Sequence, residues 1–228
     1  AGASGAAMGE ILRAELAAHG FAGKLLLCGD HEIALAGAMQ TPGCVLIAGT
    51  GSICYGKNAA GEHFRCGGGG HIIDDPGSGY ALGRDALAAA LQTEDGRLSE
   101  NALHGAVMDT VGGSGIQGIF DFVYFSRRGK GDIAALAPLV LRCAAQGDAV
   151  SLDILRRGAA ELARLVSAVM GKLGLENGSP CALAGGLLAE DNVYRRAVCA
   201  ALAPFCRPAT PEHDALFGAV QLALAAIQ

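Results

Sequence analysis

Clustered glycines constrain the fold of this chain more than any other feature. Glycine accounts for 35 of the 228 residues, about twice ordinary usage, and it gathers where apolar runs end, without a collagen-like period. Glycine tolerates positive φ angles and lets a backbone approach a ligand closely. The clusters therefore predict sharp binding loops between buried elements, at Gly49–Gly51, Gly67–Gly70, Gly77–Gly79, Gly112–Gly118 and Gly185–Gly186.

Short apolar runs alternate with longer stretches of helical periodicity. The short runs predict buried strands at Leu25–Cys28, Val45–Ala48, Ile53–Lys57, His63–Cys66 and Cys181–Ala184. The periodic stretches predict helices near residues 8–20, 31–39, 133–145, 149–173, 192–201 and 215–227, with another that begins at residue 77. A hairpin combined with long helices predicts an α/β fold.

Composition excludes several classes of function. The net charge is −5, with 17 basic and 22 acidic residues, and no basic stripe of the kind that binds nucleic acid is present. No apolar run reaches the ~18 residues of a membrane span, and the sequence shows no signal-peptide pattern. The eight cysteines contain no CxxC pair and lie mostly in apolar runs, which predicts buried free thiols in a reducing, cytoplasmic compartment.

One apparent nucleotide signature is rejected. Residues 113–118 match GxGxxG, but the preceding residues 106–111 form only a weak strand pattern. No acidic residue follows at the distance where a ribose contact belongs. A loop between helices is the simpler interpretation. A Walker-type phosphate loop, GxxxxGK[ST], is absent.

Two other positions are better placed for chemistry. The turn Gly49-Thr50-Gly51-Ser52 follows an apolar strand, where its N–H groups and hydroxyls could wrap phosphate oxygens; the alternative is a plain tight hairpin. Asp30 follows the Leu25–Cys28 run and precedes a helix. It could act as a general base on a substrate hydroxyl or serve as the N-cap of that helix.

The densest polar segment runs from Gly67 to Gly79. Its adjacent carboxylates, Asp74 and Asp75, suit water-mediated Mg²⁺ binding or hydrogen bonds to a polyol. The alternative is an acidic turn that caps the following helix. His71 is interpreted as a structural histidine.

Taken in order, these segments resemble a known family. Leu46–Ser52, the glycine run, Asp75–Tyr80 and Cys181–Gly186 are similar to the N-acetylglucosamine kinase-like branch of the BadF/BadG/BcrA/BcrD ATPases, within the sugar kinase/Hsp70/actin superfamily. The resemblance implies a two-lobed actin-like ATPase fold, with ATP and Mg²⁺ as cofactors. It also implies a small-molecule sugar substrate, N-acetylglucosamine or glucosamine, and a homodimer.

The resemblance also implies roles for individual residues. Asp30 matches the catalytic base that takes the proton of the sugar hydroxyl. The second phosphate loop corresponds to Gly49, Thr50, Gly51 and Ser52, and the adenosine motif contains Gly185 and Gly186. Positions expected at the sugar are Ser4, Asp30, Gly69 and Asp75.

The chain departs from the family pattern at several positions. Gly69 stands where these kinases usually carry Trp, Asp74 replaces Gly, Pro76 replaces Glu, and Ala81 stands where an aromatic residue is common. The family's N-terminal phosphate loop is missing. We therefore expect residues 1–43 to be the remainder of the first lobe, and residues 44–228 to be the second lobe, with a helical insertion near 84–148 and a last helix returning to the first lobe.

Two alternatives remain open at this point. One is a redox-activator ATPase whose protomers share an iron–sulfur cluster, for which Cys66 beside the glycine run is the obvious ligand. The other is a regulator that binds sugar or nucleotide without turnover. Iron content would identify the activator, and ATP binding without sugar-dependent ADP release would identify the regulator.

Overall fold

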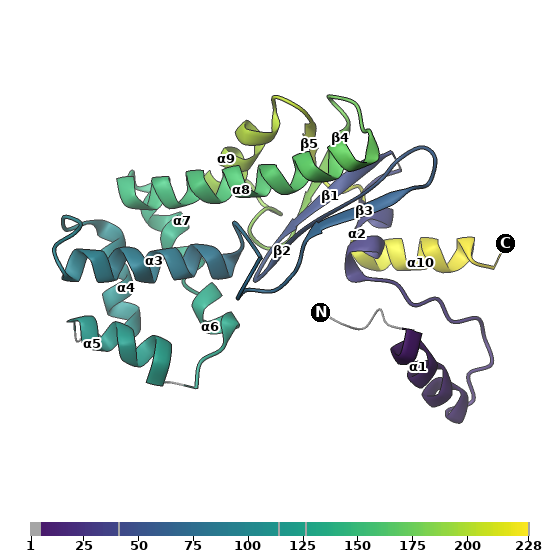
Figure 1. Ribbon diagram of the computed structural model, residues 1–228, viewed down its shortest axis with the longest axis horizontal. Coiled ribbons are helices and arrows are strands. Elements are labelled where there is room, and N and C mark those ends of the chain that lie inside the picture. Colours follow the sequence, from purple (N-terminus) through teal and green to yellow (C-terminus); the bar gives the residue numbers. More distant parts are fainter. Residues whose placement is uncertain (1–5, 41, 114, 126, 228) are drawn as a thin grey trace.

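The computed structural model describes residues 6–40, 42–113, 115–125 and 127–227 (Figure 1). Their strands form one sheet of five in the order β3-β2-β1-β4-β5. Antiparallel pairing joins β1 to β2 and β2 to β3, whereas β1, β4 and β5 run parallel. The strands are β1 (Gly43–Ala48), β2 (Ser52–Lys57), β3 (His63–Gly67), β4 (Pro180–Ala184) and β5 (Arg207–Ala209).

Helices cover both faces of this sheet (Figure 1). The long helix α8 packs on one face, α2 packs on the other, and α10 packs against α2, while α3 to α7 form a group beside the sheet. The helices are α1 (Ala6–Ala18), α2 (Asp30–Ala38), α3 (Gly79–Glu94), α4 (Ala102–Val111), α5 (Gly115–Phe120), α6 (Lys130–Ala134), α7 (Ala137–Ala145), α8 (Ala149–Leu173), α9 (Val193–Leu202) and α10 (Ala215–Ala225), with a π-helical turn at Asp121–Phe125.

The alternation of side chains along β1 divides the core in two. Leu46 and its neighbours on the same face belong to the large cluster built on α8 and α3. Val45 faces the opposite way and packs with Leu35 and Met39, at the end of α2. Because successive strand residues point to opposite faces, one apolar strand anchors helices on both sides of the sheet.

A row of cysteines crosses the sheet on the α8 side. Cys54 on β2 pairs with Cys66 on β3, and Cys44 on β1 pairs with Cys181 on β4. The thiol of Cys44 donates to the carbonyl of Pro180 at 3.9 Å, and Cys206, which precedes β5, is buried in the same core cluster. Burial raises the pKa of the Cys54 thiol, so it stays protonated. These thiols pack as small apolar side chains, as the sequence predicts.

Most predicted elements are confirmed, and three predictions are wrong. Leu25–Cys28 is not a strand, because a strand needs a hydrogen-bonded neighbour and the described residues supply none there; Leu26 is 49% exposed. The helix expected at 133–145 is two helices, with Pro138 in the first turn of α7, where its missing N–H is tolerated. Residues 106–111 lie within α4.

The loop interpretation of residues 113–118 holds only in part. Gly112 ends α4 in the left-handed conformation, with φ 104°, and α5 begins at Gly115. Neither the short helices α4 and α5 nor strand β5 was expected. Strand β5 has three residues and contains Pro208 at the sheet edge, which is where a strand tolerates proline.

Within the described part of the chain, no single helix has both the length and the apolarity to cross a membrane. The pair Lys130–Ala145 and Ala149–Leu173 meets that test only jointly, and it is bent by 118°. The division at residue 43 and the insertion boundaries stay predictions.

Candidate functional site

Two glycine-containing loops meet at the carboxyl end of β1. One is the Gly49–Ser52 turn, and the other is the loop that leads into α3. The backbone N–H of Gly79 donates to the carbonyl of Gly49 at 2.7 Å, and the N–H of Tyr80 donates to the carbonyl of Thr50 at 3.3 Å. The first turn of α3 is therefore fastened to the predicted phosphate loop, while Thr50 itself is exposed.

Ser52 makes the second connection between these loops. Its hydroxyl donates to the carbonyl of Pro76 at 2.7 Å, and its backbone N–H donates to Oδ1 of Asp75 at 3.3 Å. Ser52 is 3% exposed. Its hydroxyl therefore holds the two loops together, so of the two hydroxyls expected at the phosphates, that of Thr50 is the accessible one.

Asp75 is the most constrained residue of this region. It is 3% exposed, and it is the sole non-glycine residue with positive φ, 58°, in the described part of the chain. A Cβ on Gly51 would lie 2.9 Å from its Oδ2, so glycine is needed there. Backbone strain of this kind persists only where the surroundings enforce it and is common at functional sites. Asp75 is thus held as a fixed, buried acid beside the phosphate loop.

The acidic-cap alternative for Asp74 and Asp75 is wrong. Ser78 is the N-cap of α3 and accepts from the N–H of Ala81 at 3.2 Å. Asp74 instead accepts from the N–H of Gly69 at 2.8 Å, and a Cβ at position 69 would lie 2.8 Å from the same carboxylate oxygen. The departures at these two positions are therefore linked, because the acid at 74 occupies space beside the residue at 69.

Tyr194, on α9, is a site-supporting residue that the sequence did not single out. Its hydroxyl donates to the carbonyl of Gly77 at 2.6 Å, inside the core. A Cβ on Gly77 would lie 2.9 Å from that hydroxyl and 2.5 Å from the carbonyl of Gly158. Burial raises the pKa of Tyr194. The sequence pattern shows Tyr194 only as an apolar position of a helix, because its partner, Gly77, is 117 residues away in the chain.

We expect Tyr194→Phe to lower the free energy of unfolding by about 1–3 kcal/mol, because it leaves the buried Gly77 carbonyl without its donor. Urea unfolding followed by circular dichroism measures this. Tyr124→Phe is the matched control, since Tyr124 is 73% exposed and should change stability by less than about 0.5 kcal/mol. Equal midpoints for the two variants would contradict this role of Tyr194.

Asp30 is the first residue of α2 and not its N-cap. The cap is Gly29, whose N–H donates to Oε1 of Glu32 at 2.8 Å. The Asp30 side chain is 96% exposed and accepts from the N–H of His31 at 2.9 Å. The capping alternative is therefore wrong, and the carboxylate is accessible to a substrate.

Asp30 makes no described contact with the loops at β1. Four residues join the end of α2 to the start of β1. The first turn of α2 lies over the middle of β2, where Tyr55 pairs with Val45 of β1. The ring of His31 packs edge-on against Tyr55 of β2 at 4.8 Å, which fixes this end of α2 on the sheet. Ser4 lies outside the described residues.

The third glycine turn joins the first at the same edge, because β1 and β4 are parallel and Ile47 pairs with Ala184. Gly185 has φ 88°, and a Cβ there would overlap the backbone carbonyl of Ala48. That carbonyl also accepts from the N–H of Leu187 at 3.1 Å. Gly186 is exposed and has open space around it. Ligands of open α/β sheets bind at such carboxyl ends.

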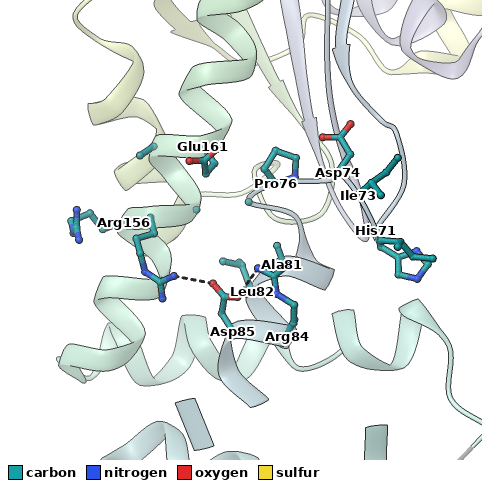
Figure 2. Close-up of a pocket in the computed structure, with 15 residues that line it drawn as sticks. His71, Ile73, Asp74, Pro76, Ala81, Leu82, Arg84, Asp85, Arg156 and Glu161 are labelled. Atoms are coloured by element: carbon teal, nitrogen blue, oxygen red, sulfur yellow. Dashed lines mark hydrogen bonds and ion pairs between the residues drawn. The ribbon is translucent and has the colours of Figure 1, made fainter. Parts of the chain in front are cut away.

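A cavity of about 600 Å³ lies between α3 and α8 (Figure 2), next to the acidic loop, which joins β3 to α3 and carries Asp74 and Asp75. Its wall includes Asp74 and Pro76, but Asp75 and the phosphate loop do not line it. Two of its arginines share one acid: Arg84 contacts Asp85 at 2.8 Å and Arg157 contacts it at 3.2 Å. Of the residues that the sequence predicts for the site, Gly49–Ser52, Asp75 and Gly185 lie together at the strand ends, outside the lining of this cavity.

The described residues contain no group of three or more His, Cys, Asp or Glu side chains that could hold a metal ion. Asp75 is the carboxylate beside the phosphate loop, and Oδ2 faces the ammonium of Lys130 at 3.7 Å. Mg²⁺ in kinase sites is held through substrate phosphates and water with few protein carboxylates. A single carboxylate, that of Asp75, therefore fits a Mg²⁺ ion that is bound mainly by a nucleotide. The described residues do not offer enough ligands to hold the ion by themselves.

The sequence matches a family model and two curated proteins. The model, described as the BadF/BadG/BcrA/BcrD ATPase family, matches residues 2–223. A Clostridium acetobutylicum N-acetylmuramic acid/N-acetylglucosamine kinase is 37% identical over 209 residues, covering 90% of this chain and 68% of that protein. A Dictyostelium discoideum N-acetyl-D-glucosamine kinase is 31% identical over 174 residues, covering 74% of this chain and 53% of that protein.

Two crystal structures share the arrangement of elements. A candidate N-acetylglucosamine kinase from Chromobacterium violaceum superposes with a TM-score of 0.74 at 31% identity, covering 96% of this chain and 73% of that one. A second, from Porphyromonas gingivalis, has a TM-score of 0.73 at 19% identity, covering 97% of this chain and 74% of that one. At that identity the second likeness concerns the fold alone.

Proposed function

The chain belongs to the BadF/BadG/BcrA/BcrD ATPase family and has the actin-like ATPase fold, and from this we propose that it is an ATP-dependent kinase of an amino sugar, N-acetylglucosamine or glucosamine. The observation that carries the proposal is the convergence of Gly49–Ser52, Asp75 and Gly185 at one edge of the sheet. The names of both curated relatives support it. The chain spans about two thirds of one relative and half of the other, so the proposal concerns the whole protein.

In the proposed reaction, a sugar hydroxyl oxygen attacks the γ-phosphorus of ATP, the bond to the β–γ bridging oxygen breaks, and ADP leaves. We assign the hydroxyl proton to the carboxylate of Asp30, which is exposed and lies 3.4 Å from Nδ1 of His31. Phosphoryl transfer depends mainly on positioning and charge stabilisation. A single oriented carboxylate is therefore sufficient as the base.

The remaining predicted residues divide between the two substrates. We place the phosphates at Gly49–Ser52, where Thr50 is exposed, and the adenosine beside Gly185 and Gly186. The sugar would meet Asp75, near Gly69 and, by resemblance, Ser4. Mg²⁺ bound with ATP would neutralise phosphate charge. Asp75, which accepts a hydrogen bond from Ser52 of the predicted phosphate loop, is the acid beside that loop. A homodimer and a cytoplasmic location remain predictions.

The decisive experiment is coupled measurement of ADP release from the full-length protein with Mg-ATP, with and without N-acetylglucosamine or glucosamine. Sugar-stimulated turnover is the expected result. ATP binding without any sugar-dependent ADP release would contradict the kinase and identify a regulator instead.

We expect Thr50→Val to raise the KM for ATP by about 10-fold and the KM for sugar by less than about 2-fold, because it removes an exposed hydroxyl from the phosphate loop while keeping the shape of the side chain. Steady-state kinetics with each substrate varied in turn measure both constants. Thr110→Val on α4 is the control, since its hydroxyl bonds only its own helix, at the carbonyl of Ala106. An unchanged KM for ATP would remove the phosphate-loop assignment.

The redox-activator alternative is not favoured. Cys66, its expected cluster ligand, is half-buried and packs against the large core cluster beside Cys54. Both curated relatives carry the names of kinases. Measuring the iron content of the purified protein tests this alternative directly.

A further inference from the structure

The buried carboxylate of Asp75 faces one cation, the ammonium of Lys130, at 3.7 Å between Nζ and Oδ2. The Asp75 side chain is 4% exposed, whereas that of Lys130 is 41% exposed. Lys130 begins α6, which lies far along the chain from Asp75, inside the helical group beside the sheet (Figure 1). Neither the resemblance nor the comparisons assign a role to this lysine.

Close packing of α6 on α3 produces this contact. The carbonyl of Ile133 occupies the space that a Cβ on Gly83 would take, and the Cβ of Ala134 lies 3.5 Å from the position of a Cβ on Gly79. Gly79 and Gly83 are one turn apart, so together they form a flat strip on α3. Because α3 begins directly after the acidic loop, α6 lying on this strip brings Lys130 to Asp75.

The ion pair that the described residues show for Lys130 is with Asp75, and the acid on its own helix has a backbone partner. Asp132 accepts from the N–H of Gly129 at 2.8 Å, at the start of α6. Asp75 otherwise accepts from the N–H of Ser52, at 3.3 Å. A buried carboxylate is costly unless it is paired and hydrogen-bonded, and removal of one partner leaves the other charge uncompensated.

We propose that Lys130 is a positioning residue: its ammonium fixes the carboxylate of Asp75, and through it the junction with Ser52, in the geometry that meets the sugar. The part concerning sugar rests on the proposed function. The ion pair also links the helical group to the site, because Lys130 lies on α6 whereas Asp75 lies in the loop between β3 and α3.

The test compares Lys130→Met, which removes the charge but keeps most of the length, with Lys130→Arg, which keeps the charge. We expect Lys130→Met to raise the KM for sugar by about 10-fold and the KM for ATP by less than about 2-fold. Lys130→Arg should restore the KM for sugar to within about 3-fold of the unaltered protein. Lys172→Met, at the exposed end of α8, is the control for loss of a surface lysine.

A second measurement does not depend on activity. Amide hydrogen exchange of peptides covering residues 49–52 and 74–80 should be faster in Lys130→Met than in Lys130→Arg or the control, with the exchange of β4 unchanged as evidence of folding. Unchanged exchange and sugar KM in Lys130→Met would overturn the proposal, as would an equal rise of both KM values or no rescue by arginine. Absence of sugar-dependent turnover in the unaltered protein would defeat the proposed function, and the exchange comparison would still decide the role of Lys130.

Discussion

Asp30→Asn is expected to lower turnover by about 10²-fold or more while leaving the KM values for ATP and sugar nearly unchanged. Asparagine keeps the size and the hydrogen-bonding oxygen of the side chain but cannot accept the proton of the attacking hydroxyl, and loss of a general base costs about 10²- to 10⁴-fold. The exposed position of Asp30 at the start of α2 makes misfolding of the variant an inadequate explanation for such a loss.

The matched control is Asp109→Asn, which makes the same chemical change at an exposed position of α4. Coupled ADP release at saturating substrates measures both variants. Full activity of Asp30→Asn would remove Asp30 from the reaction, and the base would then have to be sought elsewhere.

Gly185→Ala is expected to destabilise the fold by about 2–5 kcal/mol. Two costs add: a left-handed conformation, at φ 88°, costs a residue with a Cβ about 1–2 kcal/mol, and forcing extra atoms into a packed region costs about 1–3 kcal/mol. The second cost arises because the new methyl would overlap the carbonyl of Ala48 at the end of β1. Relief of that overlap would push apart β1 and β4 at the edge where the predicted loops meet.

Gly147→Ala separates these two costs. Gly147 has φ 89° but open space around it, so its variant should lose only about 1–2 kcal/mol. The midpoints of urea unfolding give both values. Equal destabilisation by the two substitutions would mean that the contact with Ala48 imposes no constraint and that φ alone explains the glycine.

Local pattern was sufficient for the elements that frame the site. The apolar run at Val45–Ala48 and the break at Gly49–Ser52 predicted strand, turn and strand, because a short apolar run and a glycine turn are properties of adjacent residues. Leu25–Cys28 has an equally apolar pattern, yet its backbone finds no partner among the described residues. Strand formation depends on a neighbour, which a local pattern does not include.

The supporting residues could not be predicted because they act across long separations in the chain. Tyr194 reaches Gly77, and Lys130 reaches Asp75, and neither has a local signal that distinguishes it from an ordinary helical residue. The position of Asp30 in the sequence left a general base and a helix cap open, and the resemblance favoured the base. The structure brings Asp75 to the Gly49–Ser52 turn and shows no contact between Asp30 and that turn among the described residues.

The cysteine row makes recovery after unfolding depend on the redox state of the solution. While the sheet is intact, Cys44, Cys54 and Cys181 are screened from solvent inside the large core cluster. Unfolding of the sheet exposes these free thiols together. Oxidation can then form disulfides between cysteines that are not neighbours in the native sheet. Heat inactivation should therefore be reversible under a reducing agent and become irreversible in air, as expected of a protein whose unfolded form is trapped chemically.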